Sequence, residues 1–292
     1  MKNGILYYYS LNVEEIVQKL DNYEFYVNDC FYILAFIKQN KNEIEQLFNM
    51  INNLDFDDFH KIIVNNKNEL ITMIDGVSYV LLKCNKKKDT ICLYDTFSKS
   101  IKVNKDLYKL LDRTNWSYLW SKKIDYFEYQ IEQFQDKYPI IKESFFYYVG
   151  LTENAIQFSS MISDSYISLS HKRIVVNMKE LDYYNPLEII IDYQVRDTSE
   201  YFKNKFFYSY LSFEEVIYYI DHVLHKEQLI TFYTRMLYPS YYFDLYESII
   251  EGKTKEKELL KVIRKTNDYE KFLKLLHKYI SNKINIICLD WI

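Results

Sequence analysis

The spacing of hydrophobic residues changes character roughly a third of the way along the 292-residue chain. Before about residue 83, aromatic and β-branched residues form short runs with the period of two that strands require. Two such runs, residues 23–37 and 69–84, each enclose a turn pair, Asn28-Asp29 in the first and Asp75-Gly76 in the second. Asp-Gly between apolar runs is a strong hairpin signal. We therefore predict two β-hairpins in this part of the chain.

Other segments of the same part carry weaker patterns. Residues 11–23, LNVEEIVQKLDNY, predict a short amphipathic helix with Asn12 as its N-cap. Residues 41–54 place their apolar side chains at helical spacing and predict a second helix. The segments 60–66 and 90–97 are rich in strand-forming residues and are predicted strands.

From about residue 115 onward, the hydrophobic residues recur at helical spacing. The helices are predicted over 117–138, 139–162, 198–207, 212–224, 226–250 and 256–280, and a strand–loop–strand insert over 168–197. We expect one compact α+β unit in three parts. They are a β-rich lobe over 1–83, a hinge and hairpin connection over 84–118, and a helical lobe over 119–292.

Composition narrows the chemistry that the chain can perform. It has 31 Tyr but only 4 Gly, and the glycines stand alone rather than in a phosphate-binding pattern. Loops that hold phosphates need Gly so that backbone N–H groups can approach the ligand. The net charge of −4 gives no general attraction to nucleic acid or to anionic membranes.

The four cysteines form no C-x-x-C pair and have no His nearby, so a zinc site is disfavoured. They fit buried, reduced thiols in a cytoplasmic protein. No apolar run reaches the ~18 residues of a membrane helix, and the N-terminus lacks the apolar core of a signal peptide. We expect a soluble cytoplasmic protein with no membrane span.

Residues 168–197, SLSHKRIVVNMKELDYYNPLEIIIDYQVRD, have the outline of a phosphotransferase site. Together with YYVGLTENAI at 147–156 and FHKIIVNNKNELITMIDGVSYVLLK at 59–83, they resemble the protein-kinase-like fold in its aminoglycoside and choline phosphotransferase branch. The chain is most similar to bacterial spore-coat CotS-type kinase-like proteins. The resemblance covers nearly the whole chain. It implies a small β-rich N-terminal lobe and a large, mainly helical C-terminal lobe.

The chain departs from the roles that this resemblance implies. His171 matches the His of the loop motif H-G-D-x-x-x-x-N, but Arg173 stands where the catalytic Asp is expected. Arg stays protonated and cannot act as a base. The loop Asn falls on Met178, and Asn177 fits only a shortened loop. Asp192 matches the metal-binding Asp at the end of the second strand.

The phosphate-binding parts of the family are missing as well. The strand Lys falls on Leu34 or Phe36, and there is no Gly-rich turn. One carboxylate, Asp192, holds Mg²⁺ poorly because the ion normally leans on carboxylates together with substrate phosphates. We therefore expect a vestigial site with no catalytic residue, no cofactor and no metal. Binding of ATP and Mg²⁺ is expected only under the alternative hypothesis, in which other residues have replaced the missing ones and the protein is an active phosphotransferase.

A buried carboxylate without a metal needs another cationic partner. We predict that Arg173 forms an ion pair with a carboxylate lining the old site, with Asp192 the favoured partner. Arg196 and Asp197 are expected to start a helix and to form a buried ion pair. The aromatic segment 241–246 is expected to pack as core, the alternative being an acceptor pocket.

Three functional hypotheses follow. The first is a catalytically inactive kinase-like protein, or pseudokinase, acting as an interaction or scaffold module with an unidentified protein partner. A spore or envelope role is what the resemblance suggests. The second is an active small-molecule phosphotransferase with a rebuilt site, and the third is an unrelated α+β binding protein.

Overall fold

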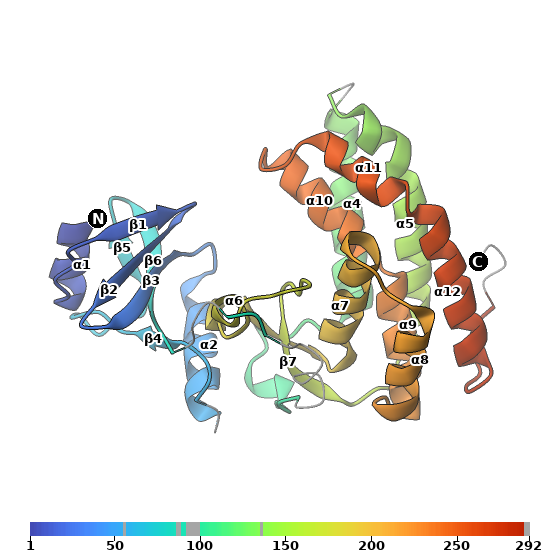
Figure 1. Cartoon of the computed structure of the whole chain (residues 1–292), viewed down its shortest axis with the longest axis horizontal. Coiled ribbons are helices and arrows are strands. Elements are labelled where there is room, and N and C mark those ends of the chain that lie inside the picture. Colours follow the sequence, from blue (N-terminus) through green and yellow to red (C-terminus); the bar gives the residue numbers. More distant parts are fainter. Residues whose placement is uncertain (55–56, 86–88, 92–99, 135–136, 289–292) are drawn as a thin grey trace. The chain divides into compact units, whose positions relative to one another are not determined.

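The computed structural model describes residues 1–54, 57–85, 89–91, 100–134 and 137–288 (Figure 1). The chain divides into two compact units. The first comprises Met1–Leu93, Asn104–Asp112 and Asn177–Ile190, and the second comprises Tyr94–Val103, Arg113–Val176 and Ile191–Ile292. Most of the predicted strand 90–97 lies outside the described residues.

The first unit is built on an antiparallel sheet. Its strands are β1 (Ile16–Lys19), β2 (Asn22–Val27), β3 (Cys30–Phe36), β4 (Lys61–Ile63), β5 (Thr72–Ile74) and β6 (Val77–Cys84). They follow the order β1-β2-β3-β6-β4, and β5 also pairs with β6. Both predicted hairpins are confirmed. Asn28 and Asp29, with φ of 47° and 62°, join β2 to β3, and Asp75 and Gly76, with φ of 52° and 78°, join β5 to β6. Positive φ at both central residues is the geometry of the type I′ turn, one of the two common turns of two-residue hairpins.

The helix predicted over residues 11–23 is wrong. The helix of this region is α1 (Lys2–Tyr9), and Ile16–Lys19 instead form β1, whose partners in β2 run from Phe25 back to Asn22. β1 and β2 form a tight hairpin with residues 20–21 at its turn, and its ladder of backbone hydrogen bonds outweighs a short amphipathic pattern. The predicted helix at 41–54 is confirmed as α2 (Lys41–Asn53).

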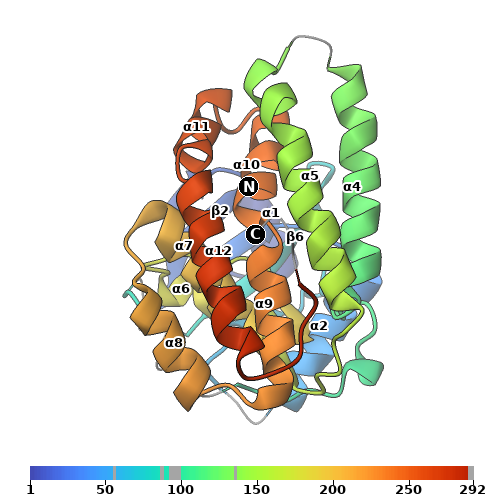
Figure 2. The same ribbon diagram turned by 90° about the vertical axis from the view of Figure 1, so that its right-hand side faces the viewer.

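The second unit is mainly helical. Its helices are α4 (Trp116–Gln133), α5 (Pro139–Ser159), α7 (Val195–Tyr208), α8 (Phe213–His222), α9 (Leu229–Leu237), α10 (Ser240–Ile250), α11 (Leu259–Ile263) and α12 (Thr266–Ser281). Figure 2 shows α4 and α5 running side by side, with α9 beside α5 and α12 beside α9. A two-stranded sheet pairs β7 (Ile167–His171) with β8 (Ile189–Tyr193). The short helix α6 (Glu180–Tyr183) lies in the first unit.

The core of the helical unit is strongly aromatic. In the segment 241–246, Tyr242, Phe243 and Tyr246 are fully buried and Tyr241 is 7% exposed, which confirms the predicted core role. Tyr148 stacks on Tyr242 with ring centroids 3.8 Å apart. Much of the unusual Tyr content of this unit therefore serves packing.

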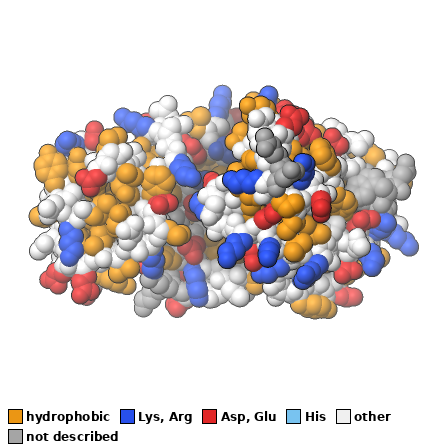
Figure 3. All heavy atoms as spheres, turned by 90° about the horizontal axis from the view of Figure 1, so that it is seen from above, with side chains coloured by type: hydrophobic (Ala, Val, Ile, Leu, Met, Phe, Trp, Pro, Cys, Tyr) orange, Lys and Arg blue, Asp and Glu red, His pale blue; other side chains and the backbone are white. Residues whose placement is uncertain are grey.

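The surface mixes residue types. On the face drawn in Figure 3, Lys and Arg side chains lie over the helical unit between hydrophobic ones, so this face is not a continuous apolar surface. None of the described helices is long and apolar enough to cross a lipid bilayer.

Candidate functional site

The candidate site lies where β7 and β8 end in the helical unit. Since the two strands pair, the residues after His171 emerge beside the start of α7. The backbone N–H of His171 donates to Asp197 Oδ1 at 2.9 Å, and His171 Nδ1 lies 2.6 Å from Asp197 Oδ2. The structure thus brings together the two motif halves that the sequence singled out.

Asp192 is completely buried, and both of its oxygens are engaged. Oδ1 accepts from the indole Nε1 of Trp116 at 2.9 Å and from the N–H of Tyr193 at 2.8 Å, and Oδ2 accepts from Arg196 Nη1 at 2.8 Å. Burial raises the pKa of the Asp192 carboxyl, while Arg196 and Arg235 oppose that rise.

Arg196 connects this carboxylate to the loop after β7. Its Nε donates to the carbonyl of His171 at 3.0 Å and its Nη2 to the carbonyl of Lys172 at 3.1 Å, while Nη1 binds Asp192. Burial alone would lower the pKa of Arg196, but the carboxylates of Asp192, Glu200 and Asp197 raise it overall. One guanidinium therefore fixes the loop to the end of β8 as a permanent cation.

The predicted pairing of Arg173 with Asp192 is wrong. Arg173 Nε lies 3.8 Å from Asp244 Oδ2 instead, and the two side chains are 62% and 43% exposed. Asp192 is bound instead by Arg196, which lies four residues later in the first turn of α7. The predicted ion pair between Arg196 and Asp197 is also wrong. Arg196 binds Asp192, and Asp197 binds His171.

Asn177, the second candidate loop residue, has a left-handed backbone with φ of 63°. It belongs to the first unit, whereas His171, Arg173 and Asp192 belong to the second. Three of the four predicted site residues, His171, Arg173 and Asp192, therefore lie in one unit.

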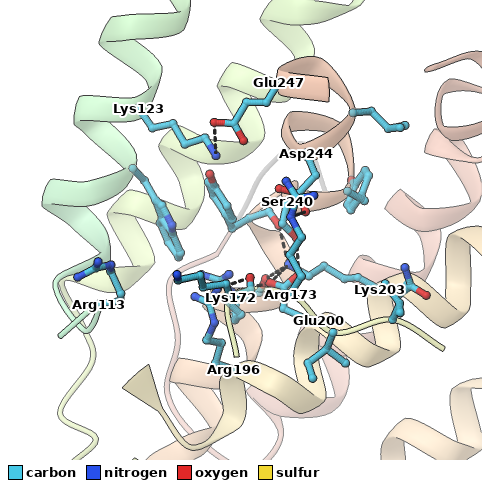
Figure 4. Close-up of a pocket in the computed structure, with 18 of the residues that line it drawn as sticks. Arg113, Lys123, Lys172, Arg173, Arg196, Glu200, Lys203, Ser240, Asp244 and Glu247 are labelled. Atoms are coloured by element: carbon cyan, nitrogen blue, oxygen red, sulfur yellow. Dashed lines mark hydrogen bonds and ion pairs between the residues drawn. The ribbon is translucent and has the colours of Figure 1, made fainter. Parts of the chain in front are cut away.

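A pocket of about 750 Å³ opens in the helical unit between α4, the loop over residues 172–175, α7, α9 and α10 (Figure 4). Among the described residues that line it, seven are basic and three are acidic. The basic ones are Arg113, Lys123, Lys172, Arg173, Arg196, Lys203 and Arg235. The acidic ones are Glu200, Asp244 and Glu247. The pocket thus has an excess of positive charge, in a protein whose net charge is −4.

A buried charged group forms one wall of the pocket. Glu200 accepts from Lys203 Nζ at 2.8 Å, from Arg235 Nε at 2.6 Å and from Ser240 Oγ at 2.6 Å. Burial alone would raise the pKa of Glu200, but Lys203, Arg235 and Arg196 lower it overall. Lys203 also donates to the carbonyls of Arg235 and Tyr238 at 2.9 Å each. Glu200 is therefore an internal counter-ion with its hydrogen bonds already made.

An aromatic stack supports this group. Trp116 and Trp120 stack with centroids 5.1 Å apart, and Trp120 stacks on Tyr238 at 4.3 Å. The guanidinium of Arg235 lies 5.3–5.6 Å from all three ring centroids. Because Trp116 also donates to Asp192, the stack connects the pocket wall to the end of β8.

Sequence reasoning missed Glu200, Lys203, Arg235 and Trp116. One signal in the sequence could have revealed Arg235. It is the single charged residue in the otherwise uncharged, buried helix α9. Charged residues are rarely buried unless they are paired, so such a position predicts a partner. In the part of the chain that the structure describes, no group of three or more His, Cys, Asp or Glu side chains could hold a metal ion.

Solved structures of small-molecule kinases resemble the chain. Spectinomycin phosphotransferase APH(9)-Ia, in complex with ADP and spectinomycin, gives a TM-score of 0.55 at 12% identity, over 94% of this chain and 92% of its own. An aminoglycoside phosphotransferase from Alicyclobacillus acidocaldarius gives 0.59 at 6% identity, over 94% of each chain. Amicoumacin kinase hAmiN gives 0.52 at 13% identity, over 99% of this chain and 94% of its own. This likeness confirms the predicted kinase-like α+β fold, with a small sheet lobe and a large helical lobe.

Two comparisons of sequence are more specific. A family described as spore coat putative kinase YutH matches residues 2–276. Endospore coat-associated protein YutH of Bacillus subtilis (strain 168) is 26% identical over 196 residues, which cover 57% of this chain and 57% of that protein. The alignment therefore spans little more than half the length of this curated relative. The predicted similarity to kinase-like spore-coat proteins is confirmed.

Proposed function

The chain belongs to the spore coat putative kinase YutH family, and we propose that it serves there as a catalytically inactive interaction or scaffold module. The observation that carries the proposal is the state of Asp192. The residue at the position of the family's metal carboxylate is fully buried, and its oxygens accept from Trp116, Tyr193 and Arg196. Mg²⁺ needs oxygen ligands that it can reach.

Metal binding at Asp192 would require Arg196 to leave it. Breaking a buried ion pair costs about 3–5 kcal/mol because the remaining charge is left uncompensated. Arg196 would also lose its hydrogen bonds to the carbonyls of His171 and Lys172. A metal ion held by one carboxylate and a nucleotide would have to offset all of these losses.

The residue at the catalytic base position supports the same conclusion. Arg173 is permanently charged and cannot accept a proton from an acceptor hydroxyl. Its side chain lies toward Asp244 of α10 rather than toward Asp192. The charge of the pocket also disfavours one alternative substrate, since aminoglycosides are polycations and the described lining has seven basic and three acidic residues.

A protein partner fits the exposed side of the helical unit. Tyr118, Tyr126 and Tyr129 of α4 and Phe146 of α5 are each 57–66% exposed. Aromatic residues are more frequent at protein–protein interfaces than on the rest of the protein surface. That the chain binds a protein partner and that it lies in the cytoplasm both stay predictions from the sequence.

The active small-molecule phosphotransferase is the second candidate, and nucleotide binding tests it. We expect that millimolar ATP with Mg²⁺ gives no Mg²⁺-dependent thermal shift and that no phosphate is released or transferred. A bound ligand at a hundred times its Kd would add about 2.7 kcal/mol to stability. A shift of several degrees that requires Mg²⁺ and disappears in Asp192→Asn would contradict the proposal. An active aminoglycoside phosphotransferase in the same assay is the positive control.

A further inference from the structure

The ion pairs of five basic residues in the pocket, Arg173, Lys123, Arg196, Lys203 and Arg235, fall into two classes. Deep in the pocket, Arg196 is held by Asp192, and Lys203 and Arg235 share Glu200, with side chains at most 12% exposed. At the mouth, Arg173 faces Asp244 at 3.8 Å and Lys123 faces Glu247 at 3.2 Å, with side chains 30–62% exposed. The deep pairs are fixed, whereas the pairs at the mouth are long or solvated and can be exchanged at little cost.

We propose that this pocket binds a small organic polyanion of the phosphate-ester class. Arg113, Lys172 and Arg173 are the main contacts, and Lys123 lies on the opposite wall. Figure 4 shows Arg113, Lys172 and Arg173 on the same side of the pocket, below Lys123 and Glu247. The proposal concerns a ligand that the chain holds, and it stands whether or not the site transfers phosphate.

The chemistry of the lining favours phosphate groups. A guanidinium presents a planar set of donors that matches two oxygens of a phosphate, and a Lys adds a compact charge. A phosphate monoester carries about −1.5 to −2 charges at neutral pH, so two such groups would offset the excess of positive charge in the pocket.

The shape of the site points to a small molecule. The volume of about 750 Å³ lies within the roughly 300–1,000 Å³ of small-molecule pockets. Its walls come from packed helices, and the stack of Trp116, Trp120 and Tyr238 holds Arg235 in place. A ligand therefore meets a basic surface that is already formed.

Asp244 gives the proposal a distinctive test. Its carboxylate is the internal competitor for Arg173, so removing the carboxylate frees Arg173 for a ligand. Asp244→Asn should therefore strengthen polyanion binding severalfold, while a variant of Arg173 should weaken it. Damage to the fold would weaken polyanion binding in both variants. Opposite changes in affinity at Asp244 and Arg173 would therefore point to their ion pair.

The probe is inorganic tripolyphosphate, titrated calorimetrically into the full chain at low ionic strength without Mg²⁺. We expect saturable binding that Lys172→Ala combined with Arg173→Ala weakens at least tenfold. The matched control is Lys271→Ala on α12, which removes one positive charge from a side chain 74% exposed and outside the pocket lining, and should change affinity less than twofold. Citrate, a polycarboxylate, serves as the second probe and should bind more weakly.

Three outcomes would overturn the proposal. The first is an absence of binding by the wild-type chain at millimolar tripolyphosphate. The second is an equal loss in Lys271→Ala, which would indicate only diffuse attraction. The third is an unchanged or weaker affinity in Asp244→Asn. Since Mg²⁺ complexes tripolyphosphate, this binding should weaken when Mg²⁺ is added, whereas an active kinase site would require the ion. The two proposals therefore fail through different results.

Discussion

The bond between Arg196 and Asp192 gives the sharpest test of how the helical unit is held together. Arg196→Met keeps an apolar stem of similar length but removes the charge from beside a carboxylate that has no exposed surface. It also removes the donors to the carbonyls of His171 and Lys172. Breaking a buried pair on one side costs about 3–5 kcal/mol. For a unit of this size, roughly 2–4 °C per kcal/mol gives a fall in Tm of about 6–20 °C.

The assay is urea unfolding followed by tryptophan fluorescence. Trp116 is a direct reporter because its indole donates to Asp192. The double variant Asp192→Asn with Arg196→Met removes both charges and should recover at least half of the loss, because no charge is then left buried. A single variant within 1 kcal/mol of wild type, or a double variant as unstable as the sum of the singles, would refute the reasoning.

Other variants test neighbouring parts of the same unit. Arg173→Ala should lose less than about 1 kcal/mol in urea unfolding, because its partner Asp244 is 3.8 Å away and both are exposed; a loss of 3 kcal/mol would show a buried role. Burial raises the pKa of Asp164 to about 6, so the folded state holds a proton that the unfolded state releases. The contribution of Asp164 to stability should therefore fall as pH rises from 4 to 6, and Asp164→Asn should remove about 2 kcal/mol of pH dependence over that range; parallel pH profiles would contradict this. Arg173→Asp should fold and still transfer no phosphate from ATP in a radiolabel assay; measurable transfer would show a site one substitution from active.

Much of the fold could be predicted from local patterns. The turn pairs Asn28-Asp29 and Asp75-Gly76 fix two hairpins because few residues tolerate positive φ at both central positions. Pro139 marks the first residue of α5 because its missing N–H costs nothing there. The segment 11–23 misled because residues 16–19 fold back through a turn at 20–21 and pair with β2 in a local hairpin, which the helical spacing of its apolar residues did not reveal.

The candidate site could be predicted only in part. Sequence order places His171, Arg173 and Asp192 in one region because the fold pairs the strands that carry two of them. Which cation reaches Asp192 depends on side-chain direction at the junction of β8 and α7. Arg196 and Arg173 both follow the paired strands in sequence, and only the folded structure shows that Arg196 binds Asp192 whereas Arg173 faces Asp244. The charged group around Glu200 joins α7, α9 and the start of α10, so no local pattern reveals it.

Under the proposed function, Arg196 does for the loop what a metal ion would do in an active kinase-like site. A metal exchanges with solvent and arrives with a nucleotide, so it makes the geometry of a loop depend on the ligand. A guanidinium is covalently part of the chain and remains charged at any physiological pH. The loop after β7 is therefore held in one arrangement without nucleotide, through Arg196 and the pair of His171 with Asp197. Arg173 lines the basic pocket and faces Asp244 rather than Asp192, and under our two proposals its charge serves ligand binding and not catalysis.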